Sequence, residues 1–214
     1  MGKVFIFDMD GVIIDSEPIH QKIEQETAAQ LGVQLEPERL ESYTGMRPKD
    51  MWASIINEEK LKVELESVLP EVEQRKVEAI GGSDLVPIPG VVPLLRELKR
   101  NQYLIAVASS SAYPLIDAVL RKFSIHHYFD CIVSGDDIES GKPAPDIYLE
   151  AAEQLNVHPS QCTALEDSTN GVSSANTAGM TTIGYKSPEA GEQDVSHADH
   201  VVDHINKVQS LLSL

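Results

Sequence analysis

Residues 3–11 read KVFIFDMDG, an apolar run that ends in two carboxylates and a glycine. The run has the length and apolar character of a buried strand, and Gly11 allows the backbone to turn sharply after it. Asp8 and Asp10 leave this strand together, which is unfavourable unless something compensates their charge, and a bound cation is the simplest compensation. A solvated Asp-Gly turn or a helix cap explains the same residues without any chemistry, so the pair alone leaves both interpretations open.

Apolar strands and amphipathic helices alternate regularly in the C-terminal part of the chain. We expect strands over residues 103–108, 130–134, 162–166, 181–185 and 199–203, and helices over residues 91–100, 113–123, 145–155, 169–178 and 204–213. Continuous apolar strands separated by helices indicate a parallel sheet that is covered on both faces. The expected fold class is therefore α/β, with a Rossmann-like parallel sheet as its core.

A helical stretch interrupts this alternation after the first strand. Helical patterns cover residues 17–31, 48–57 and 63–80, and we expect the last of them to be broken at Pro70. No apolar strand pattern intervenes, so these helices form a group of their own.

Two domains follow from this interruption. We expect residues 1–15 and 87–214 to form the α/β core, and residues 16–86 to form an inserted α-helical cap domain. The ends of an insertion lie close together. Hinges between the two domains are expected near residues 15–18 and 86–89, where prolines mark both crossings.

The charge of the chain restricts its partners. The 214 residues are 42% hydrophobic and 24% charged, which is ordinary globular composition, and the formal net charge is −17. Nucleic acid is not expected as a partner, because phosphate backbones require a basic surface. For the same reason, a phosphate-binding site in this chain needs a divalent cation and local basic groups that reverse the field.

Cysteine usage and the N-terminus bear on the compartment. The two cysteines, Cys131 and Cys162, each lie in an apolar strand-like run, and no secretory signal precedes them. We expect free buried thiols in a reducing, cytoplasmic environment. No apolar run is long enough to cross a bilayer, so no membrane partner is expected, and we expect a monomer.

Polar groups also follow the other predicted strands. Ser109 and Ser110 end the second strand, Lys142 follows the third in SGKPAPD, and Glu166 and Asp167 end the fourth. Taken singly, these residues are explained as helix caps or a surface lysine. Because the carboxyl ends of parallel strands meet at one edge of a sheet, we expect all of them to converge there. Hard oxygen ligands favour Mg²⁺, and the lysine and hydroxyls suit a phosphoryl group.

These segments resemble the haloacid dehalogenase superfamily, in particular its members with a helical cap inserted after the first strand. The resemblance rests on FDMDGVIIDSEPIH, VASSS, GKPAPDIYLEAA and EDSTNGVSSANTAGM, and it covers nearly the whole chain. By pattern, the chain looks most like small phosphosugar phosphatases and β-phosphoglucomutases.

The resemblance implies covalent catalysis. Asp8 would attack phosphorus and form an aspartyl-phosphate, while Asp10 would protonate the leaving group and then deprotonate the attacking water or hydroxyl. Mg²⁺ would be held by Asp8, by the backbone carbonyl of Asp10 and by Asp167, with Glu166 nearby or bound through water. In the same resemblance, phosphate oxygens would be bound by Ser109, Lys142 and the backbone amides around Gly11 and Ser110.

The cap is expected to select the substrate. Candidate contacts in the cap are His20, Arg47, Lys49 and Lys76, with Arg75 beside the last of these. An exposed, solvated helix face explains each of them equally well or better.

The preferred function is hydrolysis of a small phosphorylated metabolite, with sugar phosphates as the expected substrates. The first alternative is a β-phosphoglucomutase-like isomerase. Against it, Pro48 stands where the resemblance places a basic residue for the second phosphate, and Asp15-Ser16-Glu17 looks more like the phosphatases. A non-catalytic binding protein is the third hypothesis. A phosphonatase is disfavoured, because it needs a cap lysine that forms a Schiff base and the cap shows no clear one, with Lys49 left open for that role.

Overall fold

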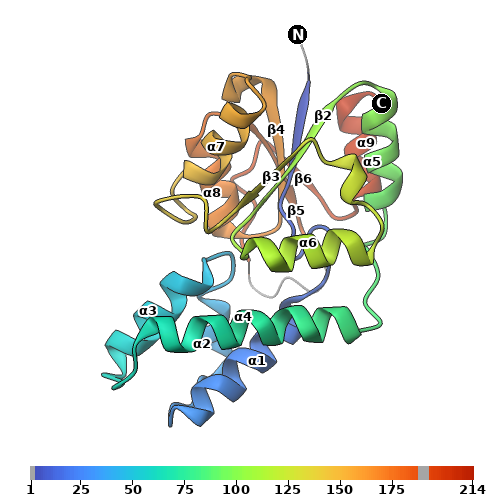
Figure 1. Cartoon of the computed structure of the whole chain (residues 1–214). Helices are drawn as coiled ribbons and strands as arrows, with labels where there is room; N and C mark the ends of the chain where they lie inside the picture. The colour runs from blue at the N-terminus through green and yellow to red at the C-terminus, as the bar shows by residue number, and fades with distance from the viewer. Residues whose placement is uncertain (1–2, 188–192) are drawn as a thin grey trace.

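The computed structural model describes residues 3–187 and 193–214. Within these ranges the chain forms one six-stranded parallel sheet in the order β3-β2-β1-β4-β5-β6, with a group of helices inserted after β1 (Figure 1). The strands are β1 (Val4–Phe7), β2 (Leu104–Ser109), β3 (Cys131–Ser134), β4 (Cys162–Glu166), β5 (Thr181–Tyr185) and β6 (His200–Val202). The α/β class and the parallel sheet are confirmed.

Helices cover both faces of the sheet, because successive side chains of a strand point to opposite sides. In β1, Phe5 and Phe7 pack toward α5, α6 and α9, whereas Val4 and Ile6 pack toward α7 and α8. These helices are α5 (Val91–Arg100), α6 (Tyr113–Lys122), α7 (Asp146–Gln154), α8 (Thr169–Thr177) and α9 (Asn206–Leu212), with short 3₁₀ turns at His126–Tyr128 and Pro159–Gln161. The strands and helices predicted after residue 87 are all present, with ends within two residues of the predicted ones.

The cap helices lie at one end of the sheet and have a hydrophobic core of their own (Figure 1). They are α1 (Glu17–Gln30), α2 (Pro37–Glu41), α3 (Pro48–Glu58) and α4 (Leu65–Gly82). Trp52 of α3 is fully buried at the centre of this core, with Ile23 of α1 and Val72 of α4 packed in the same cluster.

Two features of the cap differ from the sequence prediction. The break expected at Pro70 was wrong, because α4 continues through this residue. Proline removes one backbone hydrogen bond, but the burial of Val68, Val72 and Ile80 along one face holds the helix together. The short helix α2 was not predicted. It spans five residues and buries only Leu40, too little to produce a helical pattern.

Strand register brings the chemically interesting residues to one level. Phe7 of β1 pairs with Val107 of β2 and with Leu165 of β4. The residues that follow, Asp8 and Glu166, therefore emerge side by side at the edge of the sheet that faces the cap. In the same core, Cys131 and Cys162 are buried and free, as predicted. Among the described residues, no helix combines the length and apolar character needed to cross a membrane.

Candidate active site

Three buried carboxylates meet at the carboxyl edge of the sheet. Asp8 follows β1, Glu166 ends β4 and Asp167 comes next, and each offers an oxygen within 4.8 Å of the other two. The N–H of Asp8 donates to the carbonyl of Leu165 (3.0 Å), so the turn after β1 is held directly against β4. The sequence prediction that these acids converge is confirmed by this geometry.

Two glycines leave room for the carboxylates. Gly11 has a φ of +76°, and a Cβ atom there would lie 1.8 Å from Oδ2 of Asp167. A Cβ atom at Gly171, in the first turn of α8, would lie 2.0 to 2.1 Å from the carboxyl atoms of Glu166. Any larger residue at either position would collide with an acid of the cluster.

Lys142 is the counter-charge inside this cluster. Its Nζ donates to Oδ1 of Asp8 (2.6 Å), to Oε1 of Glu166 (2.5 Å) and to the carbonyl of Ala108 (3.3 Å). The hydroxyl of Tyr148 donates to the same Oε1 of Glu166 (2.5 Å). One lysine thus faces three carboxylates in a region that water barely reaches.

The electrostatics of the cluster favour an additional cation. Burial, followed by repulsion from Glu166, raises the pKa of Asp8 well above its ordinary value despite the attraction of Lys142. Burial and the neighbouring Asp8 likewise raise the pKa of Asp167. Burial opposes the charge of Lys142, but Asp8 and Glu166 outweigh this effect and raise its pKa. A hard dication bound to these oxygen atoms would remove the repulsion, so the donor set fits such an ion.

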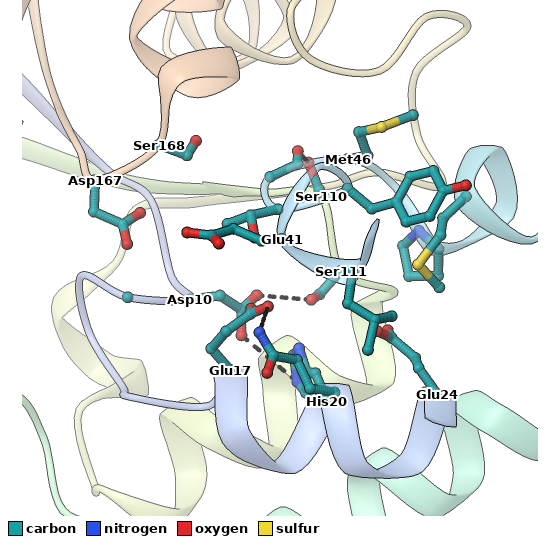
Figure 2. A pocket seen from close by; sticks show the side chains of 18 of the residues that line it. Asp10, Glu17, His20, Glu24, Glu41, Met46, Ser110, Ser111, Asp167 and Ser168 are labelled. Atoms are coloured by element: carbon teal, nitrogen blue, oxygen red, sulfur yellow. Dashed lines mark hydrogen bonds and ion pairs between the residues drawn. The ribbon is translucent and has the colours of Figure 1, made fainter. Parts of the chain in front are cut away.

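Asp10 lies next to the cluster and is oriented by hydroxyl groups (Figure 2). Ser16 and Ser111 donate to its two carboxyl oxygens, the latter at 2.8 Å, and Oγ of Ser109 lies at 3.4 Å. Nε2 of His20 lies 3.8 Å from Oδ1. Asp10 is only partly buried, so its carboxyl group is fixed in direction yet accessible from the cavity.

A cavity of about 260 Å³ separates the sheet edge from the cap. Asp8, Asp10, Gly11, Ser110 and Asp167 line it from the core side. The cap side of its wall consists of residues from α1 to α4 and the loops between them, among them His20, Tyr43 and Lys76.

The predicted phosphate-binding groups are placed differently from one another. Ser110 lines the cavity, and its hydroxyl donates to the carbonyl of Gly45 in the cap (2.8 Å). Ser109 is fully buried and does not line the cavity, and Lys142 lies behind Asp8. The N–H of Gly11 donates to the carbonyl of Ile14 (2.8 Å), so this amide is engaged within its own turn.

The predicted cap contacts also divide. His20 and Lys76 line the cavity, whereas Arg47 and Lys49 do not. The buried guanidinium of Arg47 pairs with Asp50 (2.6 and 3.0 Å) and donates to the carbonyl of Ile138 in the core (2.9 Å). Arg47 therefore bridges cap and core.

Several residues of the site were not predicted. Ser16 and Ser111 orient Asp10, Tyr148 supports Glu166, and Glu17 and Glu24 line the cavity. Ser111 is the last residue of the VASSS segment, of which only Ser109 and Ser110 were predicted to belong to the site. Tyr148 has no such signal, because an apolar residue at helical spacing indicates burial and nothing more.

Comparison with known proteins agrees with this geometry. Fructose-1-phosphate phosphatase YqaB of Escherichia coli is 31% identical over 180 residues, which cover 83% of this chain and 93% of that protein. The crystal structure of CbbY from Rhodobacter sphaeroides in complex with phosphate superposes with a TM-score of 0.90, at 28% identity and with full coverage of both chains. The structure of β-phosphoglucomutase from Clostridium difficile superposes with a TM-score of 0.88, at 27% identity, covering 100% of this chain and 96% of that one.

A family model points the same way. The model described as haloacid dehalogenase-like hydrolase matches residues 5–185, which include most of the first strand, the cap and the three acids of the cluster. The match spans most of the chain. The chain belongs to the haloacid dehalogenase-like hydrolase family.

Proposed function

We propose that this protein is a Mg²⁺-dependent phosphatase that hydrolyses a small phosphorylated metabolite, a sugar phosphate, through an aspartyl-phosphate on Asp8. The observation that carries the proposal is the cluster of Asp8, Lys142, Glu166 and Asp167 at the edge of a cavity whose wall also contains Asp10. The similarity to a fructose-1-phosphate phosphatase supports the choice of substrate class.

The metal would be held by Asp8, Asp167 and the backbone carbonyl of Asp10, with Glu166 beside it or linked through water. When bound, Mg²⁺ supplies positive charge that offsets the carboxylates and the negative oxygens of the transferred group. Lys142 contributes a fixed charge beside Asp8 that lowers the pKa of this carboxyl group, and the charge of bound Mg²⁺ would lower it further and so favour the ionised nucleophile.

In the first step, a carboxyl oxygen of Asp8 attacks phosphorus while the bond from phosphorus to the leaving oxygen breaks. Asp10 gives its proton to that oxygen, so the leaving group departs as an alcohol. Hydrogen bonds from Ser16 and Ser111 hold the carboxyl group of Asp10 in one orientation.

In the second step, a water oxygen attacks phosphorus and Asp10 accepts the proton of that water. The bond between phosphorus and the oxygen of Asp8 breaks, which releases inorganic phosphate and restores both carboxyl groups. The hydroxyl of Ser110 lines the cavity beside Asp10 and would bind a phosphate oxygen if its contact with Gly45 opened.

Phosphate release from p-nitrophenyl phosphate and a panel of sugar phosphates, with Mg²⁺ or with excess EDTA, tests the proposal. We expect turnover that EDTA abolishes, and a loss of at least about 10³-fold in kcat for Asp8→Asn. Asp203→Asn is the matched control, because Asp203 is exposed, pairs with Lys207 and does not line the cavity. No turnover of any substrate, or an active Asp8→Asn variant, would refute the proposal.

A phosphosugar mutase is the second candidate, favoured by the overlap with β-phosphoglucomutase over the whole chain. It predicts conversion of β-glucose 1-phosphate to glucose 6-phosphate with little release of free phosphate. Measuring both products in one reaction separates the two functions.

A further inference from the structure

The cap side of the cavity wall is acidic. Glu17, Glu24 and Glu41 lie in it, and Glu17 is drawn beside Asp10 (Figure 2). Among the residues that the structure describes, His20 and Lys76 are the only basic side chains that line the cavity.

Neither of these basic groups offers an uncompensated positive charge. Nζ of Lys76 donates to Oε1 of Glu24 (2.7 Å), and both side chains are largely or fully buried. The imidazole of His20 is almost fully buried and its Nε2 lies 3.8 Å from Oδ1 of Asp10, so a positive charge on it would already face that acid.

Arg47 lies in the chain between Met46 and Pro48, which both line the cavity, but its side chain points towards the core loop instead. Arg47 does not line the cavity, because its guanidinium is held by Asp50 and by the carbonyls of Gly135 and Ile138. A Cβ atom at Gly141 would lie 2.6 Å from Nε of Arg47, so the core loop is shaped around this side chain. A second phosphate in the cavity would therefore meet carboxylates and no available guanidinium.

An unpartnered polar group points to what the cavity does take. His20 is 7% exposed, it lines the cavity, and its Nε2 has no hydrogen-bond partner. A buried polar atom without a partner is unfavourable, which favours a ligand that supplies one. A hydroxyl group can donate to or accept from an imidazole nitrogen, and it can donate to a carboxyl oxygen of Glu17.

We propose that this cavity selects phosphomonoesters whose leaving group is a neutral polyhydroxyl or a cationic amino sugar, and rejects substrates with a second anionic group. The inference rests on the proposed function and narrows it. It also separates the phosphatase from the mutase alternative, because transfer of a phosphoryl group from Asp8 to a sugar phosphate passes through a bisphosphate.

The test compares kcat/KM at pH 8, where Glu17 is ionised because its pKa is about 7. Substrates are matched in pairs: fructose 1-phosphate against fructose 1,6-bisphosphate, and glucose 6-phosphate or glucosamine 6-phosphate against 6-phosphogluconate. Repulsion between a second anion and the acidic wall predicts values on the order of 100-fold lower for the bisphosphate and the gluconate. Equal or better use of either anionic substrate would overturn the inference while leaving the phosphatase intact. Absence of turnover for every substrate, p-nitrophenyl phosphate included, would instead refute the proposed function and this inference with it.

Charge variants assign the discrimination to the wall. At pH 8, above the pKa of about 7 that Glu17 has in the folded protein, we expect Glu17→Gln to raise kcat/KM for fructose 1,6-bisphosphate about tenfold relative to fructose 1-phosphate, since one repelling charge is removed without loss of volume. Glu38→Gln removes the same charge from an exposed position of α2 outside the cavity and should leave the ratio unchanged. A ratio that responds equally in both variants would contradict a role for the cavity wall.

Discussion

Gly11 and Asp167 occupy neighbouring space so closely that a Cβ atom on residue 11 would lie 1.8 Å from Oδ2 of Asp167. The glycine also has a φ of +76°, a conformation that other residues adopt only with strain. The turn after β1 and the acid after β4 are thus a single packed unit, on which the geometry of the proposed metal site depends.

Gly11→Ala should therefore impair both stability and metal binding. We expect a loss of at least about 1–2 kcal/mol from backbone strain alone, and a weaker affinity for Mg²⁺ because Asp167 must move. Urea unfolding and calorimetric titration with Mg²⁺ measure the two effects. Gly32→Ala is the control, since Gly32 also has a positive φ (+83°) but nothing within 4 Å of its Cβ position. Equal Mg²⁺ affinity in both variants would contradict the assignment.

Lys142→Met should be strongly destabilising when Mg²⁺ is absent. The substitution leaves Asp8, Glu166 and Asp167 together in a buried site without a counter-charge, a situation that costs about 3–5 kcal/mol. Added Mg²⁺ should restore part of this loss. Lys207→Met provides the comparison, because Lys207 pairs with Asp203 at an exposed site, where water screens the salt bridge and its loss should change stability little. Similar losses in the two variants would show that the cluster does not need the lysine.

Glu17 should make stability depend on pH. Burial, reinforced by Glu24, raises the pKa of Glu17 from 4.5 to about 7. Between these two pH values the folded state therefore holds a proton that the unfolded state has released. The stabilisation from this proton is complete below pH 4.5 and is lost as the pH rises through about 7. Glu17→Gln removes the effect, so the variant should gain on the wild type by about 1–3 kcal/mol between pH 4.5 and 8. Urea unfolding at several pH values gives the difference, and a constant gap would contradict the prediction.

Arg47→Ala should loosen the contact between cap and core. Arg47 directly precedes α3, and its guanidinium donates to the carbonyl of Ile138 in the core. The residue is almost fully buried. We expect faster hydrogen exchange in residues 43–47 and a kcat/KM lowered about 10-fold or more, since closure excludes water from the site. Arg39→Ala is the control, because Arg39 pairs with Glu58 and Glu59 within the cap. Unchanged exchange in the Arg47 variant would rule out a bridging role.

The sequence predicted most of the sheet and the core of the site. Alternating apolar strands and helices specify the fold because each strand is buried on both faces, and this produces a pattern that is local in the chain. The proximity of Asp8, Lys142 and Asp167 could be predicted from the sequence because each follows a strand, and parallel strands end at one edge of the sheet.

The remaining features depend on contacts that no local pattern encodes. The direction of Arg47 follows from how the cap sits on residues 135–138 of the core, and its sequence neighbourhood is equally compatible with a substrate contact. Tyr148 acts through a hydrogen bond to Glu166 at the end of β4, and Ser16 acts through one to Asp10 in the turn after β1. Pro70 was misread because propensity was weighed without the packing of α4 against the cap core.

The most direct test of the account is to trap the phosphoryl group on the chain. The enzyme is mixed with Mg²⁺ and a sugar phosphate that it hydrolyses, and the reaction is quenched in acid within one turnover. The protein is then digested and its peptides are analysed by mass spectrometry. The account predicts a phosphoryl group on the peptide that carries Asp8. This group should not form when EDTA replaces Mg²⁺ in the reaction, and it should be absent in Asp8→Asn. A phosphoryl group on any other residue, or full turnover by Asp8→Asn, would contradict it.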